Sequence, residues 1–357
     1  MMMLSLLPIQ ALHPQGRRRR RLAVIPIILV ALSFINLQEN NGRNQASVTD
    51  SYKHHNKFVW EPPPRRLDSL RDAFPNDVSS IASYEDLHSL VNFDIPMPRD
   101  LNIVFMGDSL TRYQYLDLAF FLSRNGTWDR EDHDEHFEIK DENMPWNSFF
   151  TFTDEVLSPF ENLCDCSRFG KNKDTARENR YFYEPHDNNR LTFLLKFGHR
   201  PFRSSWDVSY INEHSDSLVN DPQNVDIAQT LNWTEAIEDF VCKMMPRPAF
   251  FVFNSGLWAD DELVEVDVQT KIVQSLSNCN IISVYKTTTI PMIDEPKNHN
   301  RDEMCQLADI CYNVSWTGLV TPDMRADNVH FTPPIYSMLN IHLLSMLASG
   351  EVLAVNS

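Results

Sequence analysis

A serine follows a short apolar segment in the sequence GDSLTR at residues 107–112. The apolar residues before it predict a buried strand and the spacing after it predicts a helix, so Ser109 would lie exposed on a tight turn. Its backbone N–H would then lie near the helix N-terminus and could stabilise a developing oxyanion. Taken alone, the motif favours a simpler interpretation, in which Ser109 only caps the helix.

An aspartate and a histidine stand three residues apart in the segment ADNVHF at residues 326–331. A serine hydroxyl needs a base to attack an ester, and that base must be held in the right tautomer. Asp327 can be a neighbour of His330 on one turn, so its carboxylate would orient the imidazole. A solvated loop histidine is the default for so short a pattern. Its place before a predicted C-terminal helix, combined with the serine motif, favours a triad of Ser109, His330 and Asp327.

Two further positions offer donors for an oxyanion, which usually needs two or three of them. Gly198 follows an apolar run and offers a backbone N–H, although an ordinary turn glycine explains it nearly as well. Asn254 offers a side-chain amide in the more specific segment NSGLW at residues 254–258.

Short apolar runs predict the strands that position these residues, over 101–106, 191–197, 249–253 and 281–285. Apolar spacing predicts helices over 109–124, 233–245, 263–276 and 335–347. Strands that alternate with helices indicate a mostly parallel sheet covered on both faces. Functional groups gather at the carboxyl ends of such strands, and three of these ends carry the serine, Gly198 and Asn254.

The N-terminus has the pattern of a targeting segment. Five consecutive arginines at 17–21 precede the apolar run LAVIPIILVALSFINL at 22–37. Sixteen helical residues span about 24 Å, slightly less than the ~30 Å hydrocarbon core. Basic residues before the span predict a cytoplasmic N-terminus and a lumenal C-terminal domain. A cleaved signal peptide, with Ala31-Leu32-Ser33 near its cleavage site, is the competing interpretation.

The favoured type II anchor divides the chain into four parts. These are a cytoplasmic basic tail at 1–21, a signal anchor at 22–37, a flexible stem at 38–57 and a lumenal catalytic domain at 58–357. The expected compartment is the Golgi, and both interpretations of the N-terminus place the rest of the chain in the secretory pathway.

Cysteines and glycosylation sequons agree with that compartment. Six cysteines allow three disulfides in 15 connectivities: Cys164, Cys166, Cys242, Cys279, Cys305 and Cys311. A small disulfide between the last two is plausible, and a zinc site built on Cys164-x-Cys166 does not suit an oxidising lumen. N-glycosylation sequons begin at Asn125, Asn232 and Asn313.

The charge of the chain excludes one class of partner. Residues after 37 carry 27 basic and 49 acidic side chains, and such an acidic surface repels nucleic acid. The segment DHDEH at 132–136 contains ligand-type residues, but we interpret it as a solvated acidic loop rather than a metal site. Aromatic residues at 145–206 could stack on sugar rings, with core packing as the default: Trp146, Phe149, Phe150, Tyr181, Tyr183 and Trp206.

Together the motifs resemble the SGNH hydrolase superfamily, and within it the PC-esterase branch that includes the trichome-birefringence-like polysaccharide O-acetyltransferases. GDSLTRYQYL at 107–116, FVFNSGLW at 251–258 and DNVHF at 327–331 look like three blocks of that branch. The likeness covers roughly residues 100–345. It departs at Ala259, where the branch frequently has a second tryptophan, and Gly198 is matched only by its place after a strand.

The resemblance implies a three-layer α/β/α sandwich of the flavodoxin-like kind. Carried over by position, Ser109 is the nucleophile, His330 the base and Asp327 the orienting acid. Asn254 and Gly198 are the implied oxyanion donors. The remaining implied substrate-binding residues are Asp108, Arg112, Gly256 and Trp258.

We therefore expect an acyl-enzyme on Ser109 that passes its acyl group to a sugar hydroxyl or to water. Water exclusion at the acceptor site decides between these outcomes, and the sequence leaves both open. The resemblance and the anchored topology favour O-acetyl transfer to a glycan, with acetyl-CoA or an acetylated intermediate as co-substrate and no bound cofactor. The alternatives are a carbohydrate or lipid esterase of the same fold and a catalytically silent carbohydrate-binding protein.

Overall fold

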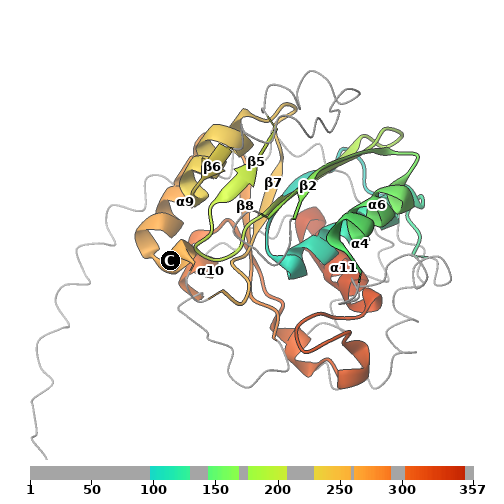
Figure 1. The fold of residues 1–357 in the computed structure, drawn as a ribbon. Coiled ribbons are helices and arrows are strands. Elements are labelled where there is room, and N and C mark those ends of the chain that lie inside the picture. The colour runs from blue at the N-terminus through green and yellow to red at the C-terminus, as the bar shows by residue number, and fades with distance from the viewer. Residues whose placement is uncertain are drawn as a thin grey trace, which may run out of the picture. The chain divides into compact units, whose positions relative to one another are not determined.

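A seven-stranded sheet forms the centre of the computed structural model (Figure 1). The structure describes residues 97–128, 144–168, 176–206, 229–258, 261–290 and 302–349. All of them belong to one compact unit, His55–Ser357.

The strand order of the sheet is β2-β3-β4-β1-β7-β8-β9. Its members, in that order, are β2 (Glu161–Ser167), β3 (Arg177–Glu184), β4 (Asn189–Leu195), β1 (Asn102–Gly107), β7 (Phe250–Phe253), β8 (Ile282–Lys286) and β9 (Ile310–Tyr312). β3 runs antiparallel to both β2 and β4, and the other neighbouring pairs are parallel. Every strand of the sheet except β3 therefore ends at the same edge. β5 (Phe202–Ser204) and β6 (Gln229–Leu231) form a separate antiparallel pair.

Helices cover both faces of the sheet, and β1 shows why. Along β1, Ile103 and Phe105 belong to one hydrophobic cluster, whereas Val104 and Met106 belong to the other. A strand buried on both faces needs such a continuous apolar run, and this run is what the sequence shows.

Each cluster is closed by its own helices, which lie on opposite sides of the sheet in Figure 1. The first is covered by α4 (Ser109–Ser123), α6 (Trp146–Leu157) and α11 (Pro333–Ser349). The second is covered by α9 (Val266–Asn278), α10 (Asp302–Leu307) and a continuous helical segment made of α8 (Trp233–Glu235), η6 (Ala236–Phe240) and η7 (Val241–Lys243). The short helices η8 (Glu262–Val264), η9 (Ser315–Leu319) and η10 (Pro322–Met324) lie in connections.

The predicted α/β class with a mostly parallel sheet is confirmed, and each predicted strand and helix has its counterpart. The sequence pattern did not predict β2, β3 or β9 of this sheet. β3 reads RENRYFYE, and its charged residues hide a strand whose side chains are buried. The charges are tolerated there because they are paired: Glu178 with Arg180 and with Arg112 of α4, and Arg177 with Asp165 of β2.

The tail, anchor and stem that the sequence predicts at 1–57 lie outside the described residues. Among the residues that the structure describes, no helix has both the length and the apolar character needed to cross a membrane.

Three disulfides join the six cysteines. They are Cys164–Cys166, Cys242–Cys279 and the predicted pair Cys305–Cys311. This number is compatible with an oxidising secretory or extracellular environment. The asparagines of the three sequons, Asn125, Asn232 and Asn313, are all exposed.

Candidate active site

Ser109 is the first residue of α4 and stands directly beyond the carboxyl end of β1. The helix is capped by Asp108, whose Oδ1 accepts a hydrogen bond from the Leu110 N–H at 3.0 Å. The Ser109 hydroxyl is therefore not the cap, contrary to the simpler interpretation of the motif. The turn requires Gly107, because a Cβ at this position would lie 2.6 Å from Thr111 Oγ1 and 2.9 Å from the Asn254 carbonyl oxygen.

His330 lies between Ser109 and Asp327 and makes a hydrogen bond to each. Its Nε2 is 2.8 Å from Ser109 Oγ, across 221 positions of sequence. Its Nδ1 is 2.8 Å from Asp327 Oδ2. The structure thus brings the three residues together in the order that a serine nucleophile, its base and an orienting acid require.

The loop that carries Asp327 and His330 is closed on itself. Arg325 and Phe331 form an isolated antiparallel bridge, and the Ala326 N–H donates to the His330 carbonyl at 3.0 Å. Inside this loop, Asp327 Oδ1 accepts from the backbone N–H groups of Val329 and His330, at 2.7 and 2.6 Å. The carboxylate is held by its own loop, so its second oxygen points at the imidazole.

The hydrogen bonds define the tautomer of His330. A carboxylate only accepts hydrogen bonds, so Nδ1 carries the proton that Asp327 accepts. In the neutral ring Nε2 is then the acceptor, and the Ser109 hydroxyl donates to it. Burial raises the pKa of Asp327, but the hydrogen bonds from the His330 ring and from two backbone N–H groups outweigh burial and lower that pKa below its ordinary value. Asp327 is consequently ionised at neutral pH, and its hydrogen bond to Nδ1 orients Nε2 toward Ser109.

A buried polar network fixes α4 against α11. These two helices adjoin the row of hydrogen bonds from Asp327 through His330 to Ser109. Asp117 Oδ1 accepts from Ser337 Oγ at 2.8 Å, and Asp117 Oδ2 accepts from Asn340 Nδ2 at 2.7 Å. Trp128 Nε1 donates to the same carboxylate at 3.2 Å, and Asn340 Nδ2 also donates to the Gln114 carbonyl at 2.9 Å. Since α4 begins at Ser109 and α11 begins three residues after His330, the network sets the position of the hydroxyl relative to the imidazole.

Asn254 follows the carboxyl end of β7 and is 2% exposed. Its Nδ2 donates to the Lys286 carbonyl at 2.8 Å. One N–H of the amide is thus used to hold the side chain against β8, and a substrate oxygen would have to use the second one. The predicted oxyanion role of Asn254 remains a prediction with that constraint.

Gly256 is needed because Asp108 lies against it. Its φ is +63°, and a Cβ there would lie 1.7 Å from Asp108 Oδ2. The segment that follows Asn254 therefore packs directly on Asp108, which caps the helix that begins at Ser109. Because Gly256 has no side chain, its backbone can approach the Asp108 carboxylate closely.

Gly198 lies in a turn after β4 rather than at the end of the strand. Its φ is +49°, and the Arg200 N–H donates across the turn to the Phe197 carbonyl at 2.9 Å. The Gly198 carbonyl accepts from Lys196 Nζ at 2.5 Å. These contacts explain the glycine as a turn residue, and a role for its N–H in the reaction stays a prediction.

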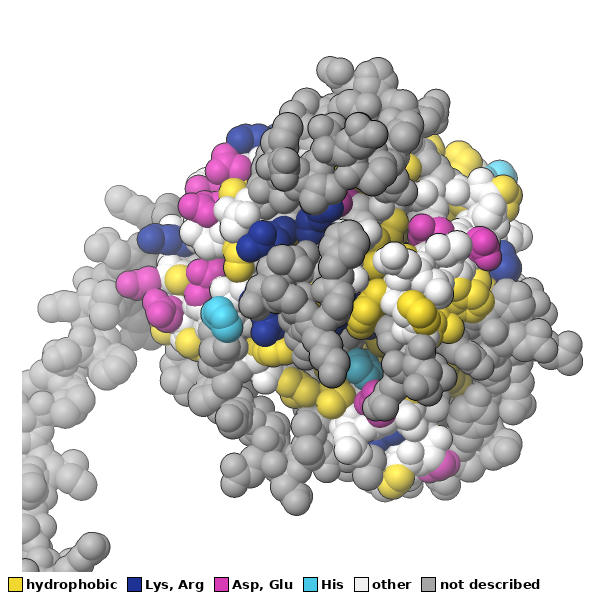
Figure 2. All heavy atoms as spheres, in the orientation of Figure 1, with side chains coloured by type: hydrophobic (Ala, Val, Ile, Leu, Met, Phe, Trp, Pro, Cys, Tyr) yellow, Lys and Arg dark blue, Asp and Glu magenta, His cyan; other side chains and the backbone are white. Residues whose placement is uncertain are grey.

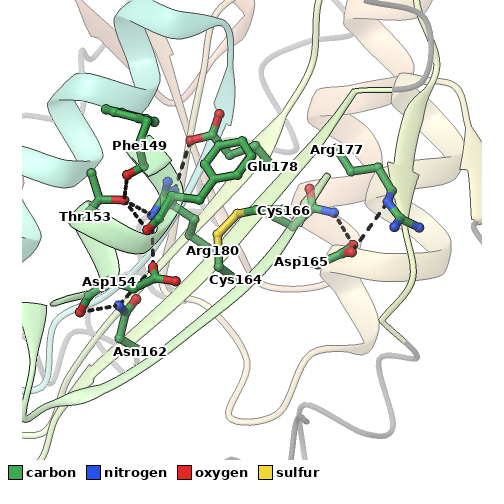
Figure 3. The surroundings of a disulfide bond; sticks show 12 residues. Phe149, Thr153, Asp154, Asn162, Cys164, Asp165, Cys166, Arg177, Glu178 and Arg180 are labelled. Atoms are coloured by element: carbon green, nitrogen blue, oxygen red, sulfur yellow. Dashed lines mark hydrogen bonds and ion pairs between the residues drawn. A yellow bond between two sulfur atoms is a disulfide. The ribbon is translucent and has the colours of Figure 1, made fainter. Parts of the chain in front are cut away.

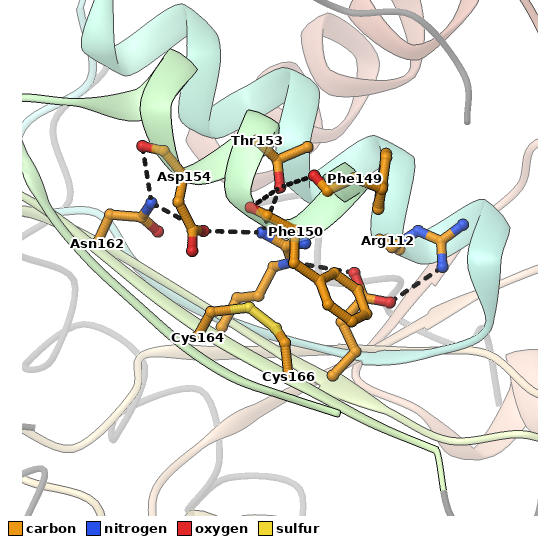
Figure 4. A network of polar contacts seen from close by, with 10 residues as sticks. Arg112, Phe149, Phe150, Thr153, Asp154, Asn162, Cys164 and Cys166 are labelled. Carbon is orange, nitrogen blue, oxygen red and sulfur yellow. Dashed lines mark hydrogen bonds and ion pairs between the residues drawn. A yellow bond between two sulfur atoms is a disulfide. The ribbon is translucent and has the colours of Figure 1, made fainter. Parts of the chain in front are cut away.

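Arg112 is buried, and its side chain makes an ion pair (Figure 4). Its Nη1 lies 3.0 Å from Glu178 Oε2, and both side chains are 2% exposed. Burial lowers the pKa of Arg112, but Glu178 and Tyr113 raise it above its ordinary value, so the guanidinium stays charged. These contacts join α4 to β3, and the substrate contact that the resemblance implies for Arg112 remains a prediction.

Glu178 also forms an ion pair with a second buried arginine, Arg180. Its Oε1 accepts from Arg180 Nε at 3.0 Å. Arg180 Nη1 donates to Thr153 Oγ1 at 2.9 Å and to Asp154 Oδ1 at 3.3 Å. Figure 3 shows the Cys164–Cys166 disulfide beside this group. The strand register places the disulfide there, since Cys166 is paired with Glu178 and Cys164 with Arg180 across β2 and β3.

Sequence reasoning missed Lys286, the last residue of β8. It is 1% exposed, and its Nζ has no hydrogen-bond partner among the described residues. Burial lowers its pKa to about 8, against the opposing effect of the Asp108 carboxylate. The signal was its position, because Lys286 directly follows the apolar run at 281–285 and so lies at the edge that carries Ser109.

The aromatic residues at 145–206 divide into two groups. Phe149, Phe150, Tyr181 and Trp206 are buried in the core, which is the default interpretation. Trp146 and Tyr183 are partly exposed. Trp258, implied to contact substrate, is also partly exposed, and its ring lies 5.5 Å from that of Phe197.

The segment at 132–136 lies outside the described residues, and no group of metal-ligating side chains occurs in the part of the chain that the structure describes. No protein-family model and no curated protein matches this chain. What the arrangement can do therefore follows from its geometry, in which a serine hydroxyl is hydrogen-bonded to an imidazole that a carboxylate orients.

Proposed function

We propose that this chain is a serine acyltransferase of the SGNH type, with the three-layer fold of the PC-esterase branch. The observation that carries the proposal is the continuous row of hydrogen bonds from Asp327 through His330 to Ser109. A hydroxyl at the start of a helix, 2.8 Å from the unprotonated nitrogen of an oriented imidazole, is built for nucleophilic attack on an acyl group.

In the first half of the reaction, Ser109 Oγ attacks the acyl carbonyl while His330 Nε2 takes its proton. Asp327 stabilises the imidazolium that forms. The negative charge on the carbonyl oxygen is stabilised at the N-terminus of α4 by the backbone N–H of Ser109, since the Leu110 N–H already donates to Asp108. His330 then returns the proton to the leaving group, and an acyl-enzyme remains on Ser109.

In the second half, His330 takes a proton from the acceptor hydroxyl, whose oxygen attacks the acyl carbonyl. The bond to Ser109 Oγ then breaks, and Ser109 regains its hydroxyl proton from His330. We assign this acceptor to a glycan. The side chains of Asp327 and His330 are 52% and 19% exposed, so the site opens at the surface, where a polymer can reach it. The resemblance of the three sequence blocks, the anchor pattern and the disulfides also support a glycan-modifying enzyme of the secretory pathway.

The test follows an isotopically labelled acetyl group by mass spectrometry. The purified chain is incubated with a labelled acetyl donor, with and without an oligosaccharide acceptor. Transfer predicts a labelled oligosaccharide that depends on Ser109 and is lost in Ser109→Ala. Release of free acetate at the same rate with and without acceptor would instead indicate an esterase. Equal product from wild type and Ser109→Ala would rule out both.

A further inference from the structure

Two arginines follow strands that end at the edge of Ser109. Arg168 comes directly after β2, and Arg200 lies in the turn after β4. Both side chains are partly exposed. Because β2, β4 and β1 run in the same direction, the chain delivers these two cations to the edge of the sheet where the nucleophile stands.

Both guanidinium groups lie over aromatic rings. That of Arg168 lies 3.8 Å from the ring centroid of Trp146 and 6.0 Å from that of Phe197. The guanidinium of Arg200 lies 5.2 Å from the Trp258 centroid. Phe197 and Trp258 contact each other, so these five residues form one arginine–aromatic cluster.

The cluster is continuous with the catalytic row on two sides. On one side, the Arg112 guanidinium lies 5.3 Å from the Trp146 ring and 4.5 Å from the Tyr113 ring, and the Tyr113 ring lies 5.3 Å from that of His330. On the other side, Trp258 belongs to the segment whose Gly256 packs on Asp108. A ligand that covers the cluster would therefore adjoin Ser109.

Positive charge accumulates here in a chain that is acidic as a whole. Partial burial lowers the pKa of Arg168 to about 10, with Arg112 and Arg200 acting in the same direction and Glu178 opposing them. Glu178 is already shared by Arg112 and Arg180. On the face seen in Figure 2, dark blue Lys and Arg side chains gather near the middle of the molecule, with hydrophobic side chains beside them.

This combination selects a ligand chemistry. A guanidinium binds a carboxylate through two parallel hydrogen bonds, and aromatic faces pack against the C–H groups of a sugar ring. We propose that the arginine–aromatic cluster binds an acidic sugar residue of the acceptor glycan, with Arg168 and Arg200 holding its carboxylate and Trp146 and Trp258 its ring. That this glycan is the acyl acceptor rests on the proposed function, but the binding site is defined by the cluster alone.

Binding can be measured without turnover in the Ser109→Ala variant. An oligouronide and the neutral oligosaccharide made from it by carboxyl reduction form a matched pair of ligands, and calorimetry gives the affinity for each. We expect the acidic member to bind about tenfold to a hundredfold more tightly, as charged hydrogen bonds predict. Added to Ser109→Ala, Arg168→Gln or Arg200→Gln should remove most of that preference. Arg168→Lys should restore part of it, because it keeps the charge and loses the fork.

Arg99→Gln, also made in the Ser109→Ala background, is the matched control. It removes an exposed cation just ahead of β1, at the opposite edge of the sheet, and should leave the preference unchanged. Equal affinity for the two ligands, or a preference that survives both arginine changes, would overturn the inference. Coenzyme A is titrated into the same variants. If the arginine changes weaken only its binding, the inference would also be overturned, because the cluster would then bind a phosphate of the acyl donor. If the acetyl-transfer assay fails while the preference persists, the proposed function fails and the binding site stands.

Discussion

Two hydrogen-bonded groups join α4 to the C-terminal part of the chain, and they differ in how far they are exposed to solvent. The hydrogen-bonded row connects Ser109, at the start of α4, to the loop at 325–331. The buried network connects Asp117, about two turns further along α4, to Ser337 and Asn340 of α11. The Asp327 side chain is 52% exposed, whereas Asp117 is fully buried.

The difference separates reactivity from stability. The row is open and held by one short loop, so its hydrogen bonds are available to change partners during a reaction. The network is closed, and each of its donors would lose much free energy if left unpaired. We therefore expect changes in the row to abolish activity with little effect on folding, and changes in the network to do the reverse.

The largest effect on activity should come from His330→Gln. Glutamine keeps polarity but cannot act as a base, so kcat should fall by about 10⁴-fold or more, as for other enzymes with a serine–histidine pair. The free energy of unfolding, measured in urea, should change by less than about 1 kcal/mol, since the side chain is partly exposed and glutamine is also polar. A large loss of stability would mean that the row is structural.

Asp327→Asn should reduce kcat by about 10²- to 10⁴-fold. The amide oxygen can still accept from the backbone N–H groups of Val329 and His330, so the loop should keep its shape. The amide N–H would favour the wrong tautomer of His330. The pH profile gives a second readout. The lowered pKa of Asp327 contributes stability that is present above pH 4 and is lost as the pH falls below it, so wild type and variant should converge in stability in acid.

Asn340→Leu should destabilise the fold by about 3 kcal/mol, because it removes a donor from the buried Asp117 carboxylate and from the Gln114 carbonyl. Urea unfolding measures this change. On the same helix, Ser345→Ala is the matched control, since Ser345 Oγ donates only to the Ile341 carbonyl within α11. Its effect should stay within about 0.5 kcal/mol. Equal effects of the two substitutions would remove the distinction between network and ordinary helix surface.

Asp261 extends the comparison to a buried carboxylate with too few donors. Its Oδ1 accepts from Trp233 Nε1 and the Leu263 N–H, while Oδ2 has no partner among the described residues. Burial raises the pKa of Asp261 to about 6. The stability that it contributes is therefore present below about pH 4 and lost as the pH rises through 6.

Asp261→Asn should keep both accepted hydrogen bonds and remove this pH dependence. Relative to wild type, the variant should gain roughly 2 to 3 kcal/mol between pH 4 and pH 7. Urea unfolding at the two pH values measures the gain. A stability difference that does not vary with pH would show that Asp261 ionises normally.

The sequence predicted those parts of the molecule whose patterns are local. The apolar runs before Ser109 and Asn254 predicted β1 and β7, and the residues after them lie at one edge as the rule for parallel strands requires. The pairing of Ser109 with His330 was reached only as a hypothesis from two motifs, and the structure places them 2.8 Å apart.

What the sequence could not predict depends on pairing across distance. β3 carries Glu178 and Arg180, which read as exposed until their partners on α4 and α6 are known. Arg168 gave no signal for the same reason, because β2 was not predicted and the edge it reaches was unknown. The turn geometry of Gly198 also follows from a contact with the Lys196 side chain that no pattern shows.

The central claim is that the Ser109 hydroxyl is a nucleophile, and labelling with a fluorophosphonate probe tests it directly. The probe reacts with activated serines, and peptide mass spectrometry locates the adduct. We predict a single adduct on Ser109 in the wild-type chain and none in Ser109→Ala or His330→Gln, with circular dichroism showing that both variants are folded. Labelling of Ser109→Ala at the wild-type rate, or a folded wild-type chain that stays unlabelled, would contradict the account.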